Sequence, residues 1–234
     1  MTRIPALKRA LLAVSAVVIT GTLQAQQSFE GVWILDRIVE ETPAPLTAQG
    51  MAVQAAYDLL NDDPSLRCEP ASLGRIWGNP NSRTGIHLVD GNLQLEHELF
   101  DVRRTPSAEG SGAAPTLARN LQDTRFSALG TQTYEIDGEK LRIASTGHSA
   151  GYIRTGTGYP QGDGGSATET FWREGEHLML ELVYRDPVLF VGDYRILHRL
   201  AATGETSVPV YNCTDADYDW FEQLNAEATG GAKP

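Results

Sequence analysis

Three tight-turn signals, each between two stretches of alternating residues, constrain the fold of this chain more than any other feature. The turns are Asp90-Gly91, Asp137-Gly138 and Glu174-Gly175. They separate the paired stretches 86–89 and 93–100, 133–136 and 141–145, and 168–172 and 178–184. An Asp-Gly pair between such stretches favours a type I′ turn that joins two antiparallel strands. Hairpins that follow one another along a chain indicate an antiparallel meander.

Further strands are expected on either side of these hairpins. Residues 29–39 are rich in β-branched and aromatic side chains, and strands also fit 194–200 and 208–211. The total is roughly eight to ten strands, a number typical of closed antiparallel sheets. We therefore predict a mainly β domain, an antiparallel meander that closes into a lipocalin-like β-barrel. A β-sandwich is the alternative.

Two helices are expected beside the strands. The first covers 47–60, where Thr47 can cap the start and Met51, Ala55 and Leu59 recur at helical spacing. The second is a short C-terminal helix that Thr214 can cap. The remaining segments are predicted to be an extended passage through 68–80, glycine-rich loops at 107–115 and 155–166, and a disordered tail at 228–234.

The N-terminus has the layout of a secretory signal. Arg3, Lys8 and Arg9 precede an apolar run over 10–19, and a small residue, Ala25, follows at a suitable cleavage point. The rival reading is a retained membrane anchor, but the run is shorter than the roughly 20 apolar residues that span a bilayer. We predict a signal peptide at 1–25, a single β-rich domain at 26–227, and a periplasmic or secreted location.

The charge of the exported chain limits its partners. Without residues 1–25 it carries 16 Lys and Arg against 30 Asp and Glu, a formal charge of −14. Such an acidic surface repels phosphates, so nucleic acid and anionic membranes are poor partners. We expect no stable membrane insertion after signal removal. A small molecule, a cation or a basic protein is compatible with the charge, and the sequence leaves the oligomeric state open.

Cys68 and Cys213 are the two cysteines of the chain. An even count in an oxidising compartment favours a disulfide between them, and two separately buried thiols are the alternative. A bridge across so long a loop would constrain the unfolded chain by roughly 4–5 kcal/mol on the chain-entropy estimate. The five histidines share no tight metal-ligand spacing. We therefore predict no metal and no cofactor, and no motif identifies a catalytic residue.

The strand at 93–100 carries the most informative polar residue. Alternation places His97 on the same face as Leu93 and Leu95, so it would lie inside a barrel, and Glu98 would then point outward. The simple interpretation is a hydrogen-bonded core histidine and a solvated charged face. The functional one is a pocket in which His97, with Arg103 or Arg104, orients a polar group of an apolar molecule.

Several segments resemble those of a family of secreted bacterial proteins. The matching pieces are LTAQG, NDDPSLRCEP, ELFDVRR, DGEKLRI, GYPQ, TETFWREGEHLMLELVYRDP and VPVYNCT, which cover most of the chain after the signal, in the family's order. The chain departs from the family's pattern at 133–138 and 107–115. The resemblance implies a periplasmic or secreted location and a structural role for Cys68 and Cys213. It also places Glu98, Arg103 and Glu169 in shared segments, as a buried ion-pair network or as a site, and it implies no reaction.

Three functional hypotheses follow. The favoured one is a periplasmic barrel that binds a small, largely apolar molecule in an unfilled interior. The second is a cofactor-free enzyme that uses the same cavity, with His97 or Glu98 as acid or base. The third is an envelope interaction protein with a filled barrel. The candidate ligand-binding residues are His97, Glu98, Arg103, Glu169, Trp172 and Tyr184, and Leu95, Leu180 and Leu182 are expected to line the same interior.

Overall fold

The computed structural model describes residues 29–108, 116–117 and 129–211. The signal peptide, Cys213, the C-terminal helix and the tail at 228–234 lie outside the described residues, so these remain predictions. Within the described part of the chain, no helix is long and apolar enough to span a membrane.

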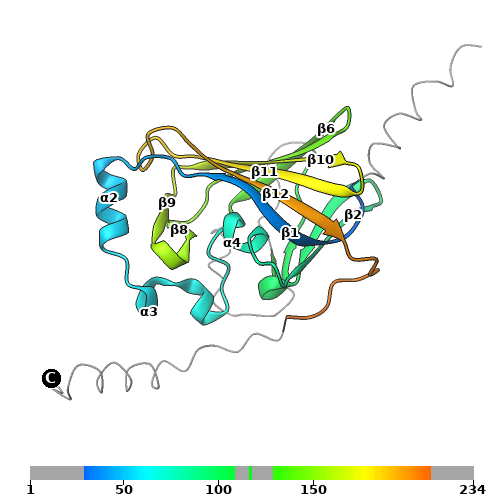
Figure 1. Ribbon diagram of the computed structural model, residues 1–234, viewed down its shortest axis with the longest axis horizontal. Coiled ribbons are helices and arrows are strands. Elements are labelled where there is room, and N and C mark those ends of the chain that lie inside the picture. The colour runs from blue at the N-terminus through cyan, green and yellow to red at the C-terminus, as the bar shows by residue number, and fades with distance from the viewer. Residues whose placement is uncertain (1–28, 109–115, 118–128, 212–234) are drawn as a thin grey trace, which may run out of the picture.

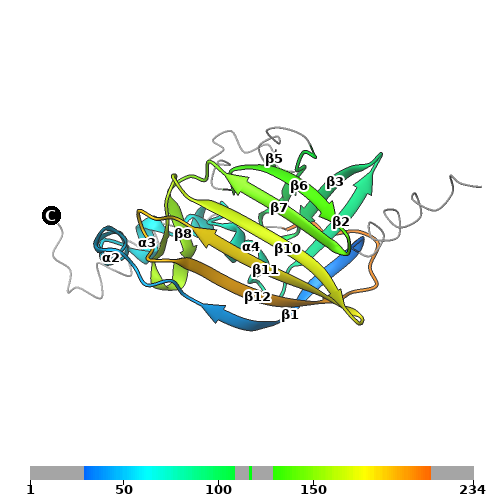
Figure 2. The ribbon, with the colours of Figure 1, turned by 90° about the horizontal axis from the view of Figure 1, so that it is seen from above.

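A strongly curled antiparallel sheet of ten strands dominates the structure (Figures 1 and 2). Its strand order is β5-β4-β3-β2-β1-β12-β11-β10-β7-β6. The strands are β1 Gly31–Thr42, β2 Arg83–Val89, β3 Asn92–His97, β4 Val102–Arg104, β5 Thr116–Leu117, β6 Thr131–Asp137, β7 Lys140–Thr146, β10 Ser166–Glu174, β11 His177–Arg185 and β12 Asp193–Ala202. A separate hairpin consists of β8 Gly151–Arg154 and β9 Tyr159–Gln161.

One bridge joins the two ends of the curled sheet. The Ser107 amide donates to the Gln132 carbonyl at 3.1 Å, and the Tyr134 amide donates to the Ser107 carbonyl at 2.8 Å. These bonds connect the segment after β4 to β6, which is the last strand of the sheet order. The prediction of a lipocalin-like barrel is therefore confirmed, and the sandwich alternative is not.

The three predicted hairpins form, but only one has the predicted turn. Asp90 and Gly91 both have positive φ, 51° and 78°, as a type I′ turn requires. The other two loops are shifted by one residue, to Gly138-Glu139 and Gly175-Glu176. Only their glycines have positive φ, 59° and 62°, which is the pattern of a type II′ turn.

The predicted single helix at 47–60 is wrong, because the chain forms two shorter helices there, α2 Ala48–Ala55 and α3 Leu59–Asp62. The Asp58 carboxylate accepts from the amides of Leu60 and Asn61, so it starts a new helix instead of continuing the first. The expected apolar face is also not buried, since Met51 is 56% exposed and Leu59 50% exposed.

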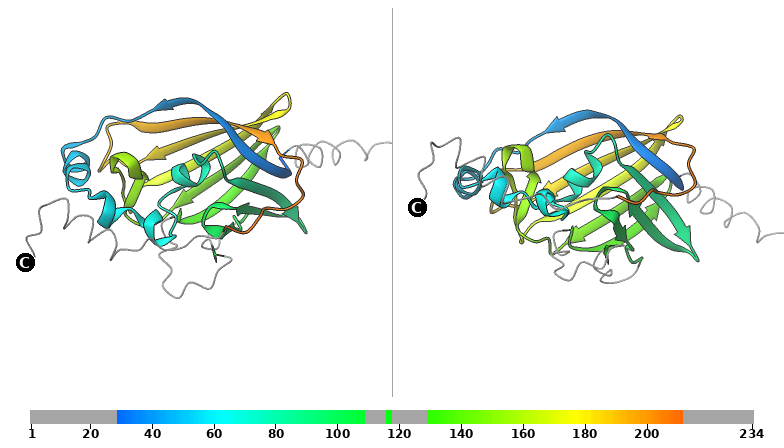
Figure 3. Two further views of the ribbon diagram at one scale, coloured as in Figure 1. Left: turned by 60° about the horizontal axis from the view of Figure 1, so that its bottom comes forward. Right: turned by 90° about the horizontal axis from the view of Figure 1, so that it is seen from below.

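A short helix that the sequence analysis missed lies on the concave side of the sheet. This helix, α4 Leu73–Trp77, lies within 68–80, the passage that was expected to be extended. The 3-10 turn η1 Pro64–Arg67 precedes it. Figures 1 and 3 show α4 inside the curve of the strands. Leu73, Ile76 and Trp77 are at most 2% exposed, so α4 fills part of the barrel interior.

Two further expectations are corrected by the structure. The segment 155–166 is not a plain loop, because it contains the 3-10 turn η4 Thr155–Thr157 and the buried strand β9. Residues 208–211 form no strand. The Tyr211 amide instead donates to the Asp101 carboxylate at 2.7 Å, and the Tyr211 ring packs edge-on against Phe100.

Candidate functional site

A buried ion pair occupies the middle of the barrel. The Arg104 guanidinium binds both carboxylate oxygens of Glu169, with Nη1 at 2.9 Å from Oε1 and Nη2 bonded to Oε2. Both side chains are fully buried. The Nε of Arg104 donates to Gln132 Oε1 at 2.9 Å, and the Trp77 indole donates to Glu169 Oε1. The pair is therefore bidentate and has further partners, as a buried charge pair requires.

His97 completes this network in its neutral form. Its Nε2 lies 3.2 Å from Arg104 Nη1, and its Nδ1 lies 3.0 Å from Thr84 Oγ1. Because a guanidinium can only donate, Nε2 of His97 accepts the hydrogen bond from Arg104. The proton of the neutral ring is therefore on Nδ1, which donates a hydrogen bond to Thr84 Oγ1. Burial, together with the charge of Arg104, lowers the pKa of His97 well below its ordinary value. The Trp77 ring packs edge-on against His97, with centroids 4.8 Å apart.

The structure divides the six candidate residues between the two faces of the sheet. His97, Glu169 and Tyr184 lie inside and are at most 3% exposed. The other three belong to the outer face: Arg103 pairs with Glu96 at 3.2 Å, Trp172 donates to Glu174 at 2.9 Å, and Glu98 accepts from the Arg83 amide at 2.8 Å.

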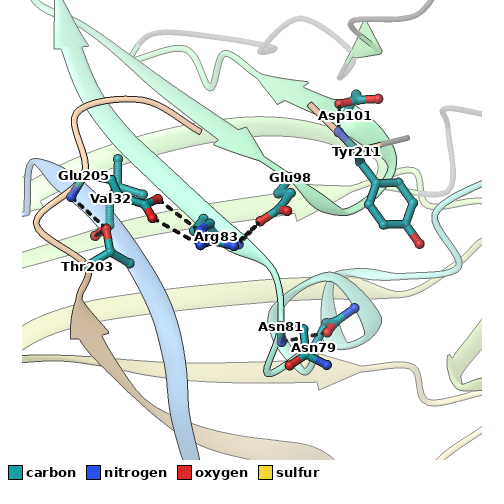
Figure 4. Close-up of polar contacts among 9 residues, drawn as sticks. All are labelled: Val32, Asn79, Asn81, Arg83, Glu98, Asp101, Thr203, Glu205 and Tyr211. Atoms are coloured by element: carbon teal, nitrogen blue, oxygen red, sulfur yellow. Dashed lines mark hydrogen bonds and ion pairs between the residues drawn. The ribbon is translucent and has the colours of Figure 1, made fainter. Parts of the chain in front are cut away.

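Glu98 therefore does not share a site with His97. Figure 4 shows Arg83 between Glu98 and Glu205, with Nη1 at 3.5 Å from Glu98 and Nε at 2.9 Å from Glu205. These side chains are 15–42% exposed. This cluster is an ion-pair network on the outer side of β2, and it ties the strand to the segment after β12.

Arg104, Trp77 and Gln132 belong to this network but are not among the six candidate residues, although Arg104 was named beside Arg103 as a possible partner of His97. For Arg104 the signal is the register of β3 and β4, in which Leu95 pairs with Arg104 and Glu96 with Arg103. Residues paired across an antiparallel ladder share a face, so Arg104 points inward with Leu95. The β4 strand has only three residues, which is too short for alternation to reveal this.

A second buried histidine makes the fold sensitive to acid. Burial, aided by the charge of Arg154, lowers the pKa of His198 to about 4. In the unfolded chain this ring takes up a proton near pH 6.5. Between these values the unfolded state binds more protons, so the free energy of unfolding falls as the pH is lowered, by about 3 kcal/mol for this one group.

Urea titrations at pH 7 and pH 4.5 check this expectation. His198→Gln should reduce the loss of stability between these two pH values by about 2 kcal/mol, and the share that comes from buried His97 should remain. His87→Gln, at a partly exposed position of β2, should retain it. Equal pH dependence in wild type and His198→Gln would contradict the assignment.

A cavity of about 350 Å³ opens at one end of the barrel, where α2 and the β8–β9 hairpin lie together in Figure 1. The connection between β11 and β12 forms its third wall. The lining residues are Gln49, Val53, Ala150, Gly151, Tyr152, Gln161, Gly162, Asp163, Gly164, Asp186, Val188 and Leu189. We refer to this cavity as the end pocket.

Hydrogen bonds fix the elements that form the end pocket. The Thr47 amide donates to the Leu189 carbonyl at 2.9 Å, and its hydroxyl donates to the Val188 carbonyl at 2.6 Å. From the other end of α2, the Gln54 side chain donates to the Thr157 carbonyl at 3.0 Å. Gly50 lies so close to Leu189 that a Cβ there would meet the carbonyl oxygen at 2.3 Å. The pocket is thus preformed.

No family model matches the sequence, and no curated protein matches it. Among solved structures, wild-type fluorescent protein UnaG is 13% identical, with a TM-score of 0.37 over 76% of this chain and 98% of that one. An abundant heat soluble (SAHS) protein from Ramazzottius varieornatus is 12% identical, with a TM-score of 0.34 over 75% of this chain and 96% of that one. At these identities and TM-scores the two structures carry no inference about function.

Among the described residues, no group of three or more His, Cys, Asp or Glu side chains is placed to hold a metal ion. Cys68 is buried, and its predicted bridge to Cys213 stays a prediction because Cys213 is outside the described residues.

Proposed function

We propose that this protein is an exported barrel that binds a small, largely apolar molecule, and that the molecule binds in the end pocket. The observation that carries the proposal is the contrast between the filled middle of the barrel and the open cavity at its end. The middle of the barrel is occupied by α4 and by the Arg104–Glu169 pair. The end pocket, in contrast, is a cavity with a volume of about 350 Å³, and Val53, Tyr152 and Leu189 are among the residues that line it.

The size and chemistry of the end pocket suit a ligand of modest size. Small-molecule pockets commonly measure roughly 300–1,000 Å³ and combine apolar walls with a few polar groups that orient the ligand. Apolar contacts come from Val53, Leu189 and the Tyr152 ring, and the polar groups from Gln161 and Asp186. A molecule with one ring system and one polar group matches this combination.

The proposed location is the periplasm or the extracellular medium. It is supported by the N-terminal segment, in which basic residues are followed by an apolar run and then by a small residue at the cleavage point. The resemblance to secreted proteins supports it as well. Sequencing the N-terminus of the protein from the periplasmic fraction tests it. A start at Gln26 is the expected result, and a retained Met1 in the membrane fraction would contradict it.

Titration with 1-naphthalenemethanol, a neutral aromatic alcohol, tests the proposed ligand class. We expect saturable binding to the protein purified from the periplasm, with amide chemical-shift changes at Gly151, Gly162 and Leu189, which line the pocket. Amides beside Leu95 and Phe171, deep in the core, should change little.

Paired tryptophan variants provide the control. Val53→Trp fills the end pocket and should weaken binding at least about tenfold, because the ring takes the ligand's place. Val39→Trp adds the same ring on the exposed side of β1, where Val39 is 43% exposed, and should leave binding unchanged. Equal binding by both variants, or no binding by the wild type, would overturn the proposal.

The filled middle of the barrel also favours the hypothesis of an envelope interaction protein. That hypothesis predicts a barrel interior occupied by side chains, which α4 and Trp77 provide here. Native mass spectrometry of the exported protein separates the two functions. A mass excess that leaves on denaturation supports ligand binding, and a bare chain that co-purifies with another protein supports the interaction role.

A further inference from the structure

A buried carboxylate beside the end pocket has one oxygen without a hydrogen-bond partner. Asp186 is 3% exposed. Its Oδ1 accepts from the amides of Val188 at 3.0 Å and Leu189 at 3.3 Å, which closes the turn after β11. Its Oδ2 has no partner among the described residues. A buried acceptor that lacks a donor destabilises the fold, and it does so more strongly if it is charged.

The described surroundings of Asp186 supply no donor to this oxygen. Arg185, the adjacent cation, is turned away and pairs with Asp193 at 3.1 Å. Oδ2 also lies close to the backbone of Gly162, since a Cβ on that residue would be only 2.1 Å from Oδ2. Asp186, Gly162 and Leu189 all line the end pocket, so the missing donor can approach through it.

The charge of the end pocket favours a cationic donor. Two acids, Asp163 and Asp186, line it, and no Lys, Arg or His stands among its described lining residues. An aromatic pair lies at its wall, since the rings of Tyr57 and Tyr152 have centroids 4.4 Å apart and Tyr152 lines the pocket. Aromatic faces and carboxylates together are how proteins commonly hold organic ammonium groups.

We infer that the ligand of the end pocket carries a protonated nitrogen, whose N–H donates to Asp186 Oδ2 while the apolar body packs against Val53, Tyr152 and Leu189. The inference rests on the proposed function and adds the class of ligand to it, an amine with a compact apolar body. The pairing satisfies the unpaired carboxylate oxygen and its charge together. A neutral donor would satisfy the oxygen without balancing the charge, and an anionic ligand would oppose the charge.

Three probes with one naphthalene body and different head groups test the inference at pH 7. They are 1-naphthylmethylammonium, 1-naphthalenemethanol and 1-naphthoate. Because the ammonium adds the attraction between opposite charges to a hydrogen bond that the alcohol can also donate, the ammonium should bind about 10- to 100-fold more tightly than the alcohol. The carboxylate should bind most weakly. The ammonium should also shift the amide resonances of Val188 and Leu189, whose N–H groups contact the same carboxylate.

Two isosteric variants locate the effect. Asp186→Asn keeps an oxygen for the two backbone amides but removes the charge, so it should abolish the preference for the ammonium while the alcohol still binds. Asp163→Asn removes an exposed lining acid and should keep most of that preference. If Asp186→Asn does not fold, the ranking of the three probes by the wild-type protein still decides the question.

The outcomes separate this inference from the proposed function. If the alcohol binds in the end pocket as tightly as the ammonium, or if 1-naphthoate binds best, the inference fails and the proposed function stands. If none of the three probes binds, the proposed function fails and the inference fails with it.

Discussion

Arg104→Met is expected to lower the free energy of unfolding by about 3–5 kcal/mol, because it leaves the Glu169 carboxylate charged and unpaired in the core. Methionine keeps much of the side-chain volume, so lost packing contributes little. Among the described residues, Glu169 then retains only the Trp77 indole as a donor, since both guanidinium contacts disappear. Urea denaturation monitored by circular dichroism measures the change.

Two matched variants show whether the unpaired charge is the cause. The double variant Arg104→Met with Glu169→Leu removes both charges and should recover much of the loss, since apolar replacements of buried pairs are often well tolerated. Arg103→Met removes the neighbouring cation, whose partner Glu96 is 30% exposed, and should cost less than about 1 kcal/mol. A double variant less stable than Arg104→Met, or equal losses at positions 103 and 104, would contradict a buried and mutually dependent pair.

Trp77→Ala is expected to cost about 3–5 kcal/mol, because it removes the largest side chain of α4 from the barrel interior. Trp77 is 2% exposed, packs edge-on against Phe171 with centroids 5.5 Å apart, and donates to Glu169. The variant therefore creates a cavity and removes one partner of the buried carboxylate. Chemical denaturation checks the loss of stability.

Trp172→Ala is the control for Trp77→Ala. Trp172 lies on the outer face of β10, with the Lys140 ammonium 5.9 Å from its ring, and its loss should cost about 1 kcal/mol or less. Equal losses of unfolding free energy in the two variants would contradict the role of α4 as the filling of the barrel.

The cavity left by Trp77→Ala should also admit a second molecule of 1-naphthalenemethanol into the barrel interior.

The barrel could be predicted from the sequence because its signals are local. The turn glycines and the alternation of β10 and β11 specify hairpins without knowledge of distant residues. The inward face of His97 followed in the same way, and the structure places that side chain fully inside. The shifted turns at Gly138 and Gly175 show the limit of this reading, because one residue of register decides between turn types.

The interior and the end pocket depend on contacts between distant segments, which a pattern along the chain does not reveal. The helix α4 has five residues, and its position is fixed by the Tyr184 hydroxyl, which accepts from the Gly74 amide at 2.9 Å. A Ser72 cap followed by apolar residues at 73, 76 and 77 was the available signal. The inward direction of Arg104 required the β3–β4 register. Asp186 is not among the six candidate residues, because no pattern along the chain shows that its carboxylate lies beside the end pocket.

The most direct test of the central claim is a crystal structure of the exported protein with 1-bromonaphthalene, located by the anomalous scattering of bromine. We predict a bromine peak in the end pocket, in contact with Val53, Tyr152 and Leu189, and an Arg104–Glu169 pair that is unchanged. A peak inside the barrel, beside Leu95 and Phe171 with α4 displaced, would contradict the claim that the filled barrel binds its ligand at the end.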